Sequence, residues 1–366
     1  MFHKKQLLVT VLVMCGSLTS CCNCSADKLE SVLMPDAYVI GRVHLSKIQQ
    51  SSIVKLMRKD EAVSSKIKVD KLNTVLKKYD LSDKDFTSFV VGLKLNIKNI
   101  KNFNDALLKN DGREFVFGIQ SSKPITLEQL KKIVIDSSKQ DKEINVKVQS
   151  ITKDGVKLLL IKDKGENTVQ PLVLAVEKKE KIIVGGSSPK TVISSLKRIK
   201  AGKTIGFNAE LNKLKSEVSK KADFYLLGYI PEAIRKKTGL GRQEEPKKSD
   251  KEDNKVSIEV LKDINALSIQ ADFMDKKVGI NIYSYFISRK SAQDAHKLLN
   301  QFLPMLKFLA MGVTQGVTLP ILDSIGNKLS KLKPELKINF TFTEQDYTSI
   351  QEIAKKKEMP KINIRE

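Results

Sequence analysis

Two segments far apart in the chain share one hydrophobic pattern. Asp36–Val43 and Asp223–Ile230 are both rich in β-branched and aromatic residues, which predicts a β-strand in each. Asp, Tyr, two aliphatic residues and Gly recur in the same order in both segments. A short stretch with a helical pattern follows each strand, at Ser46–Arg58 and at Pro231–Lys237. This repetition predicts two related halves.

The elements expected after these strands follow a parallel order in the two halves. In the first half we expect a helix at Thr126–Ser138. We expect strands before it at Phe89–Ile97 and Glu114–Ile119, and strands after it at Val146–Ile151, Val156–Ile161, Leu172–Val176 and Ile182–Val184. In the second half we expect strands at Val256–Phe273, Val278–Phe286 and Lys337–Phe342, a helix from about Ser291, and a last helix at Glu344–Lys355.

Local signals fix the ends of several of these elements. Thr126 and Gln129 have the spacing of a capping box, and Ser291 and Asp294 offer a similar cap. Lys153-Asp154-Gly155 lies between two alternating stretches, which predicts a tight β-hairpin.

The resulting fold class is α+β, with two related modules of mainly antiparallel sheet and helices packed on one face. We place the first module at residues 36–205 and the second at 206–366. A charged loop at 239–256 falls inside the second module. A chance match between the two repeated strands stays open as an alternative, since one sequence cannot separate it from a duplication.

The first 20 residues have the layout of a secretory signal peptide. Lys4 and Lys5 precede an apolar run from Leu7 to Met14, and small and polar residues follow. The apolar run is too short to cross a bilayer comfortably. Cleavage is expected after Ser20.

Leu18-Thr19-Ser20-Cys21 resembles the lipobox of bacterial lipoproteins. The resemblance implies that the thiol of Cys21 receives a diacylglycerol, that a peptidase cuts between Ser20 and Cys21, and that the new amine is often acylated, for example with palmitate. Residues 21–35 would then form a tether. Because Cys22 is not Asp, the same resemblance favours the outer membrane in a cell with two membranes. An ordinary secretory signal is the alternative.

Charge and cysteine content narrow the classes of partner. The chain carries 65 Lys and Arg against 42 Asp and Glu, a net charge of +23; loss of Lys4 and Lys5 leaves +21. The basic residues are interspersed with acids and form no Arg-rich, aromatic patch, which argues against nucleic acid as a partner. Anionic lipids or wall polymers suit this charge better. No Cys follows Cys24, so we expect no disulfide in the folded body.

The sequence offers little material for catalysis or metal binding. His44 and His296 are the histidines of the mature chain, and they lack the spacing of metal ligands, so we interpret them as structural. Asp80–Asp85 lacks the glycine and the final Glu of a calcium loop and is expected to be a turn that caps a short helix. Gly185–Pro189 is interpreted as Ser188 capping a helix that begins at Pro189. We therefore expect no catalytic residue, cofactor or metal.

The most apolar stretch of the body is Phe302–Leu322, whose prolines, glycines and Lys307 argue against a membrane span. Its periodicity predicts a helix against a sheet. The leading hypothesis is a lipid-anchored envelope protein with a non-enzymatic binding or scaffolding role and a possible protein partner. One alternative is a carrier of an apolar ligand, lipid or peptide, in a cavity under this segment or under its first-module counterpart. A second is an envelope hydrolase that uses carboxylates.

Overall fold

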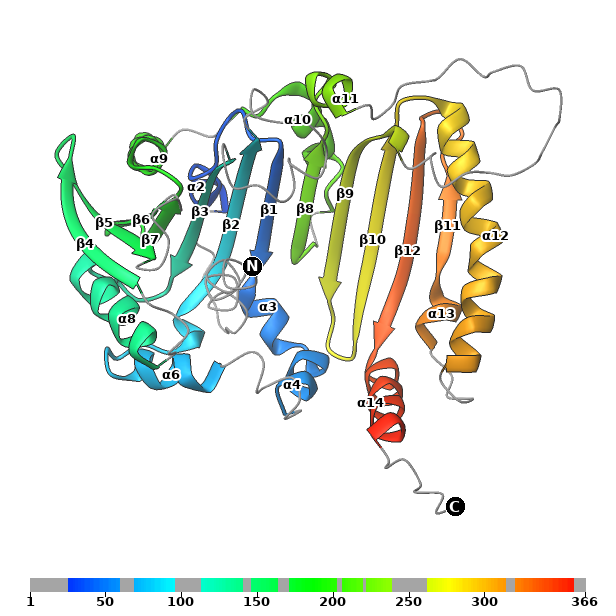
Figure 1. Ribbon diagram of the computed structural model, residues 1–366, viewed down its shortest axis with the longest axis horizontal. Coiled ribbons are helices and arrows are strands. Elements are labelled where there is room, and N and C mark those ends of the chain that lie inside the picture. The colour runs from blue at the N-terminus through cyan, green and yellow to red at the C-terminus, as the bar shows by residue number, and fades with distance from the viewer. Residues whose placement is uncertain are drawn as a thin grey trace, which may run out of the picture.

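A computed structural model describes residues 26–59, 69–95, 113–140, 146–163, 171–202, 206–219, 222–238, 262–313 and 320–358. These residues form one 12-stranded sheet in the order β11-β12-β10-β9-β8-β1-β2-β3-β7-β6-β5-β4. Neighbouring strands are antiparallel throughout. The sheet extends across the whole width of the molecule, and both halves of the chain contribute to it (Figure 1).

The strands are β1 (Val39–His44), β2 (Phe86–Leu95), β3 (Arg113–Ser121), β4 (Val146–Lys153), β5 (Val156–Asp163), β6 (Leu172–Glu177), β7 (Ile182–Gly186), β8 (Phe224–Tyr229), β9 (Ile264–Phe273), β10 (Lys277–Phe286), β11 (Gly326–Leu329) and β12 (Glu335–Thr343). The helices are α2 (Ala26–Glu30), α3 (Leu45–Gln50), α4 (Ser52–Lys59), α6 (Val69–Lys77), the 3-10 turn η1 (Asp83–Asp85), α8 (Leu127–Gln140), α9 (Pro189–Ala201), α10 (Ala209–Ser216), α11 (Glu232–Thr238), α12 (Arg289–Val313), α13 (Pro320–Ser324) and α14 (Glu344–Glu358).

The two halves repeat one strand order outward from a central seam between β1 and β8. The first half runs β1-β2-β3-β7-β6, and the second runs β8-β9-β10-β12-β11. Within the seam, Ile40 pairs with Leu227, the residue that occupies the same place in the repeated sequence pattern. Two identical strands related by a two-fold axis through the sheet would meet in this register, so the pairing at the seam matches the repeated sequence pattern.

The repeated glycine of the pattern has a role at this seam. Gly41 pairs with Leu226, and Gly228 pairs with Val39, so each glycine faces the aliphatic residue of the other half. A Cβ on Gly41 would lie 3.3 Å from Leu226 Cδ1, and one on Gly228 would lie 3.4 Å from Val39 Cγ2. The pattern found in the sequence is therefore the packing surface that joins the two halves.

The hairpin β4–β5 has no counterpart in the described second half. Its turn residues Asp154 and Gly155 both have positive φ, 49° and 72°, as a two-residue type I′ turn requires. The hairpin was predicted from these residues. It extends the first half beyond β6 at one edge of the sheet.

Helices cover both faces of the sheet, where packing on one face was expected. Face A, marked by Val116, Val173 and Val184, packs against α9, α10 and the segment that follows α2. Face B, marked by Phe117 and Leu174, packs against α3, α6 and α8. In the second half, α4 and α12 also pack on face B. The prediction placed all helices in one layer. In the structure, α9 and α10 form a second layer, because their apolar sides pack against face A.

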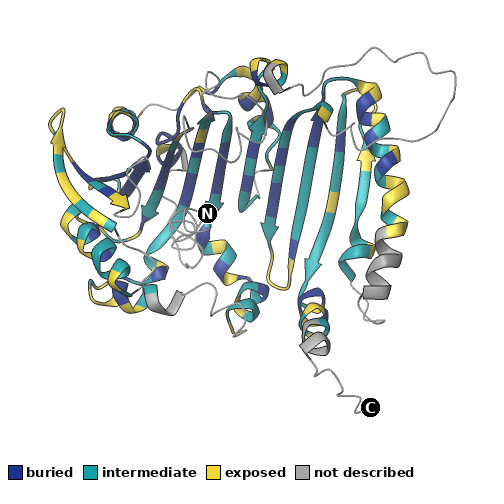
Figure 2. Cartoon of the chain, in the orientation of Figure 1, coloured by how far each residue is buried: buried dark blue, intermediate teal, exposed yellow. Residues whose placement is uncertain are grey.

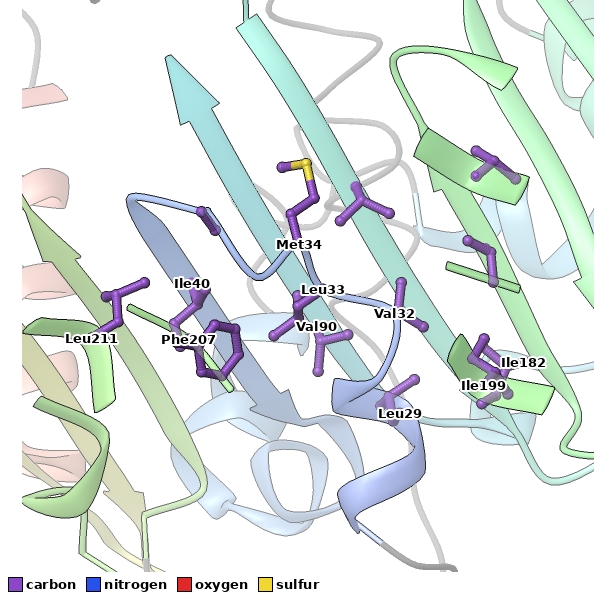
Figure 3. Packing of buried hydrophobic residues seen from close by; sticks show 14 of the residues in the cluster. Leu29, Val32, Leu33, Met34, Ile40, Val90, Ile182, Ile199, Phe207 and Leu211 are labelled. Atoms are coloured by element: carbon purple, nitrogen blue, oxygen red, sulfur yellow. The ribbon is translucent and has the colours of Figure 1, made fainter. Parts of the chain in front are cut away.

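The predicted tether at 21–35 is corrected at its C-terminal end. Leu29, Val32, Leu33 and Met34 are buried, and Figure 3 shows them over the sheet with Ile40 and Val90. Arg198 of α9 donates hydrogen bonds from Nε to Ser31 O (3.1 Å) and from its guanidinium to Val32 O (2.9 Å). The segment after Glu30 therefore belongs to the core. Figure 2 shows the buried positions concentrated in the first half and at the seam.

Most predicted helix ends agree with the structure. Thr126 and Gln129 form the capping box of α8, and Ser188 accepts the Thr191 N–H at the start of α9 (3.2 Å). The cap of α12 differs from the prediction. Helix α12 begins at Arg289, and Ser288, rather than Ser291, caps it by accepting the Ser291 N–H at 3.0 Å.

Candidate functional site

Helix α8 forms the roof of an apolar cavity on face B. The capping box at Thr126 begins the helix, and apolar residues recur along one side of it, where they face the sheet. Leu130, Ile133, Val134, Ser137 and Ser138 line the cavity from this side. The spacing of three and four residues places all five on one helical face.

The floor and the second wall come from α6, from six strands and from the turn before α8. In chain order, these elements are α6, β2, β3, the turn before α8, β4, β5, β6 and β7. Their lining residues are Leu72, Leu76, Phe86, Phe117, Ile119, Ile125, Val146, Ile161, Leu172, Leu174 and Ile183. The space is about 100 Å³ and is partly open to solvent. A single water needs about 10–15 Å³, so this space is larger than a packing defect for one water. We call it the α8 cavity.

The cavity contains a tightly packed aromatic residue at its floor. The Phe117 ring lies on Gly185 of the neighbouring strand β7, where a Cβ would be 2.0 Å from Phe117 Cζ. Phe117 also contacts Phe89, with ring centroids 6.0 Å apart. Because Gly185 has no side chain, the ring can lie flat against the sheet and leave the space above it open. The glycine in the predicted Gly185–Pro189 segment thus shapes the cavity.

Among the described residues, those that line the cavity carry no carboxylate, imidazole, amine or thiol. Its polar side-chain groups are the hydroxyls of Ser137 and Ser138. Ser138 Oγ donates to Ile135 O within α8 (2.8 Å). Ser137 Oγ is buried and has no hydrogen-bond partner in the described part of the protein. Such a lining is suited to an apolar molecule.

A buried ionic cluster lies on face A at the seam. Glu30 accepts hydrogen bonds from Arg42 Nη1 of β1 (3.2 Å) and from the Tyr225 hydroxyl of β8 (2.7 Å), and it also pairs with Lys215 of α10. Burial by itself would raise the pKa of Glu30. Lys215, Tyr225 and Arg42 together hold that pKa below its usual value of 4.5. Burial and the Glu30 charge raise the pKa of Tyr225.

A second, more exposed cluster repeats this chemistry in the other half. Glu217 accepts a hydrogen bond from the Tyr285 hydroxyl and pairs with Lys333 (2.9 Å). Burial opposes ionisation of Glu217, but these two partners lower its pKa. Glu30 and Glu217 each precede the repeated Asp by six positions, a signal that the sequence analysis missed. Both clusters join separate elements, and neither borders the α8 cavity.

The histidines do not meet each other or a carboxylate cluster. His44 is half-buried, and its Nδ1 lies 3.4 Å from Ser88 Oγ. Burial, with the charges of Arg42 and Lys47, lowers the pKa of His44 to about 4. His296 lies 3.4 Å from the Asn300 side chain on α12. Within the described ranges, no group of three or more His, Cys, Asp or Glu could hold a metal ion.

Several predicted features fall elsewhere. Ser20, Cys21 and the charged loop 239–256 lie outside the described residues. Asp85 accepts from Ser82 N (2.7 Å) and caps η1, as predicted for Asp80–Asp85. An apolar cavity was expected under Phe302–Leu322 or under its first-module counterpart. The described side chains of α12 in this range are partly exposed, and the cavity lies under α8, the counterpart helix. In the part of the chain that can be described, no helix has the length and apolar content to cross a membrane.

Comparison with known proteins gives a distant likeness in structure alone. No protein-family model matches the sequence, and no curated protein matches it. Crystal forms III, I and IV of TP0453 align with TM-scores of 0.41, 0.39 and 0.41 and identities of 9%, 10% and 9%. The alignments cover 90%, 91% and 90% of this chain and 99%, 99% and 97% of those chains. Likeness at this level carries no argument about function.

Proposed function

We propose that this chain is a lipid-anchored envelope protein, held through Cys21, that binds an apolar ligand in the α8 cavity without catalysing a reaction. The observation that carries the proposal is the cavity itself. A space of about 100 Å³, whose lining residues from α6, α8 and the sheet carry no charge in the described part of the chain, suits an apolar molecule. Engineered cavities of about this size, lined by Leu, Ile and Phe, stay dry and bind small apolar ligands.

The ligand is distinct from the protein's own anchor. Cys21 lies a few residues before α2, and the chain from Leu29 to Met34 packs on face A. The cavity residues Phe117 and Ile183 lie on face B. Since successive residues of a strand point to opposite faces, the sheet separates the Leu29–Met34 segment from the cavity. The ligand proposed for the cavity is a molecule other than the acyl chain expected on Cys21.

The test is native mass spectrometry of the full chain carrying Cys21→Ser, which prevents the lipid attachment expected from the lipobox. We expect a bound mass that extracts into organic solvent. Val134→Phe places a larger side chain in the cavity and should abolish that mass. Val218→Phe makes the same change at a half-buried position that packs on face A and should retain it. A bare protein that also fails to bind a neutral apolar dye would refute the proposal.

A second candidate function is binding of a protein partner through α12. Phe302 and Met305 are 36% and 46% exposed on this helix, which is unusual for large apolar side chains so close together. Crosslinking in the native envelope, compared between the wild-type chain and a Phe302→Ser/Met305→Ser variant, tests it. A partner captured equally by both proteins argues against α12 as the contact.

A further inference from the structure

Exposed lysines gather around helix α2, where the described part of the chain begins. They come from α2 itself, from the turn between β6 and β7, and from the C-terminal end of α9: Lys28, Lys178, Lys179, Lys181, Lys197 and Lys200. We call these six lysines the α2 patch. Among the described side chains, the acids of the same turn are Glu177 and Glu180, and Glu180 pairs with Lys28. Helix α9 has four basic residues and no acid in its sequence. The patch therefore carries a net positive charge.

Direct contacts place the three elements of the patch side by side. Lys28 Nζ lies 2.8 Å from Glu180 Oε1, which joins α2 to the turn between β6 and β7. Arg198 of α9 donates a hydrogen bond from Nε to Ser31 O at 3.1 Å, just after the end of α2. One buried cluster also contains residues of α2, β7 and α9 (Figure 3). The patch is thus one surface, although its residues are far apart in the sequence.

The lysines of α9 lie on the side of the helix that faces away from the sheet. The apolar residues of α9 are buried against face A. Lys197 and Lys200 are exposed and three positions apart, so they share the outer side of the helix. Cations at the end of a helix also suit its dipole, which accounts for these two positions. The dipole does not account for the three lysines of the turn between β6 and β7, which lie outside the helix.

The short link to Cys21 limits which surface can face a membrane. Ala26, the first residue of α2, is five positions after Cys21. An extended chain covers about 3.3–3.6 Å per residue, so this link spans at most about 18 Å. With a lipid on Cys21 inserted in a bilayer, the start of α2 has to lie within that distance of the membrane surface. The α2 patch surrounds this point.

From the charge and the short link we propose that the α2 patch lies against the headgroups of a bilayer that contains anionic phospholipid. Clustered lysines beside a membrane attachment point are attracted to anionic lipid. This attraction falls off within a Debye length, about 8 Å at physiological salt, and the link is short enough to hold the patch that close. The lipid supplies the attachment, and the patch decides which way the body faces. The proposal rests on the Cys21 anchor of the proposed function and is independent of the α8 cavity.

The test measures how the protein without its lipid binds to vesicles, so that the patch acts alone. Residues 21–366 carrying Cys21→Ser contain every residue that the structure describes. This protein is mixed with vesicles of phosphatidylcholine, with or without phosphatidylglycerol, and the bound fraction is measured by sedimentation. At about 0.1 M salt we expect binding to the vesicles with phosphatidylglycerol to be at least about tenfold tighter than to the neutral ones.

A variant of the patch tests whether these lysines make the contact. Lys178→Gln/Lys179→Gln/Lys197→Gln/Lys200→Gln removes four exposed charges and leaves the buried side of α9 unchanged. A lysine close to an anionic surface contributes about fivefold in affinity. The variant should therefore bind the anionic vesicles at least about tenfold more weakly. Replacement of the same four residues by Arg keeps the charge and should retain binding.

A matched control separates the patch from the net charge of the chain. Lys132→Gln/Lys157→Gln/Lys290→Gln/Lys297→Gln also removes four exposed lysines, from α8, β5 and α12. Because these elements lie away from α2, the control should lose less than about threefold in affinity. Circular dichroism of both variants checks that they fold as the unchanged protein does.

Three results would overturn the proposal. The first is an equal loss in the patch variant and the control, which would mean that net charge alone governs binding. The second is equal binding to neutral and anionic vesicles. The third is no binding to either, which would favour a soluble anionic wall polymer as the partner of the patch. The proposed function would stand in each case, because lipid attachment at Cys21 and dye binding in the α8 cavity are measured separately.

Discussion

The ionic cluster around Glu30 allows a prediction with a defined magnitude. Glu30 is 8% exposed and Arg42 9%, and they lie on α2 and β1 with Tyr225 of β8 as a third partner. Glu30→Gln keeps the shape of the side chain and can still accept from Tyr225. It removes the negative charge that compensates Arg42 and Lys215.

Loss of one partner of a buried ion pair costs about 3–5 kcal/mol. Lys215 is 36% exposed at its side chain and can turn to water, whereas Arg42 cannot. We therefore expect Glu30→Gln to lower the free energy of unfolding by about 3 kcal/mol, the lower end of that range. Urea unfolding followed by circular dichroism at pH 7 measures it, provided that the denaturant slope is unchanged.

The control is an exposed pair of similar geometry. Lys28 and Glu180 lie 2.8 Å apart, with side chains 45% and 22% exposed. Glu180→Gln should cost less than about 1 kcal/mol, as solvent-exposed pairs do. If Glu30→Gln costs no more than Glu180→Gln, the cluster does not hold the seam together and the reasoning fails.

The same cluster predicts the pH dependence of stability. The folded-state pKa of Glu30 lies below its usual value of 4.5, so the folded state favours the ionised form. The stabilisation is then fully present above about pH 5 and is lost as the pH falls through the folded-state pKa. In Glu30→Gln this part of the acid destabilisation should be absent, so the two stability curves should converge at low pH.

Three further predictions concern other parts of the molecule. Gly185→Ala places a Cβ 2.0 Å from Phe117 Cζ, so we expect a loss of about 1–3 kcal/mol in urea unfolding together with weaker dye binding in the α8 cavity; unchanged values for both would contradict the packing described. His44 should remain neutral at pH 5.5 in an NMR titration, since its pKa is about 4, and a midpoint near 6.5 would contradict its burial. Tyr285→Phe removes the hydroxyl bonded to Glu217 and should cost about 1 kcal/mol in the same unfolding assay, less than Glu30→Gln, because Glu217 is 24% exposed and keeps Lys333. A cost equal to that of Glu30→Gln would contradict the difference in burial.

The alternation of apolar and polar residues was sufficient to predict most strands. Strand Asp223–Ile230 was expected where β8 lies, and Asp154-Gly155 defined the β4–β5 turn because a type I′ turn needs positive φ at both positions. The capping box of α8 was equally local. These features succeed because each depends on a few neighbouring residues and on backbone geometry alone.

Features that depend on distant contacts could not be read in the same way. Leu29 to Met34 has apolar spacing of three and four residues, but its position just after the expected lipid site favoured a tether, and only its contacts with α9 show that it is core. Ser288 was passed over as a cap because Ser291 has an acidic residue three positions later, the stronger local signal. The α8 cavity needs residues from α6, α8 and six strands, a combination that periodicity does not encode.

The two halves differ in one element that contributes to the α8 cavity. Both halves share the order of five strands and place a long helix, α8 or α12, on face B. The first half adds β4 and β5, and Val146 and Ile161 of this hairpin line the cavity. The hairpin strands thus form part of the cavity wall, and the ligand binding proposed above depends on them, while the shared strands and the Glu30 cluster join the halves in one sheet. Removing the hairpin should therefore abolish dye binding while the β1–β8 seam remains intact.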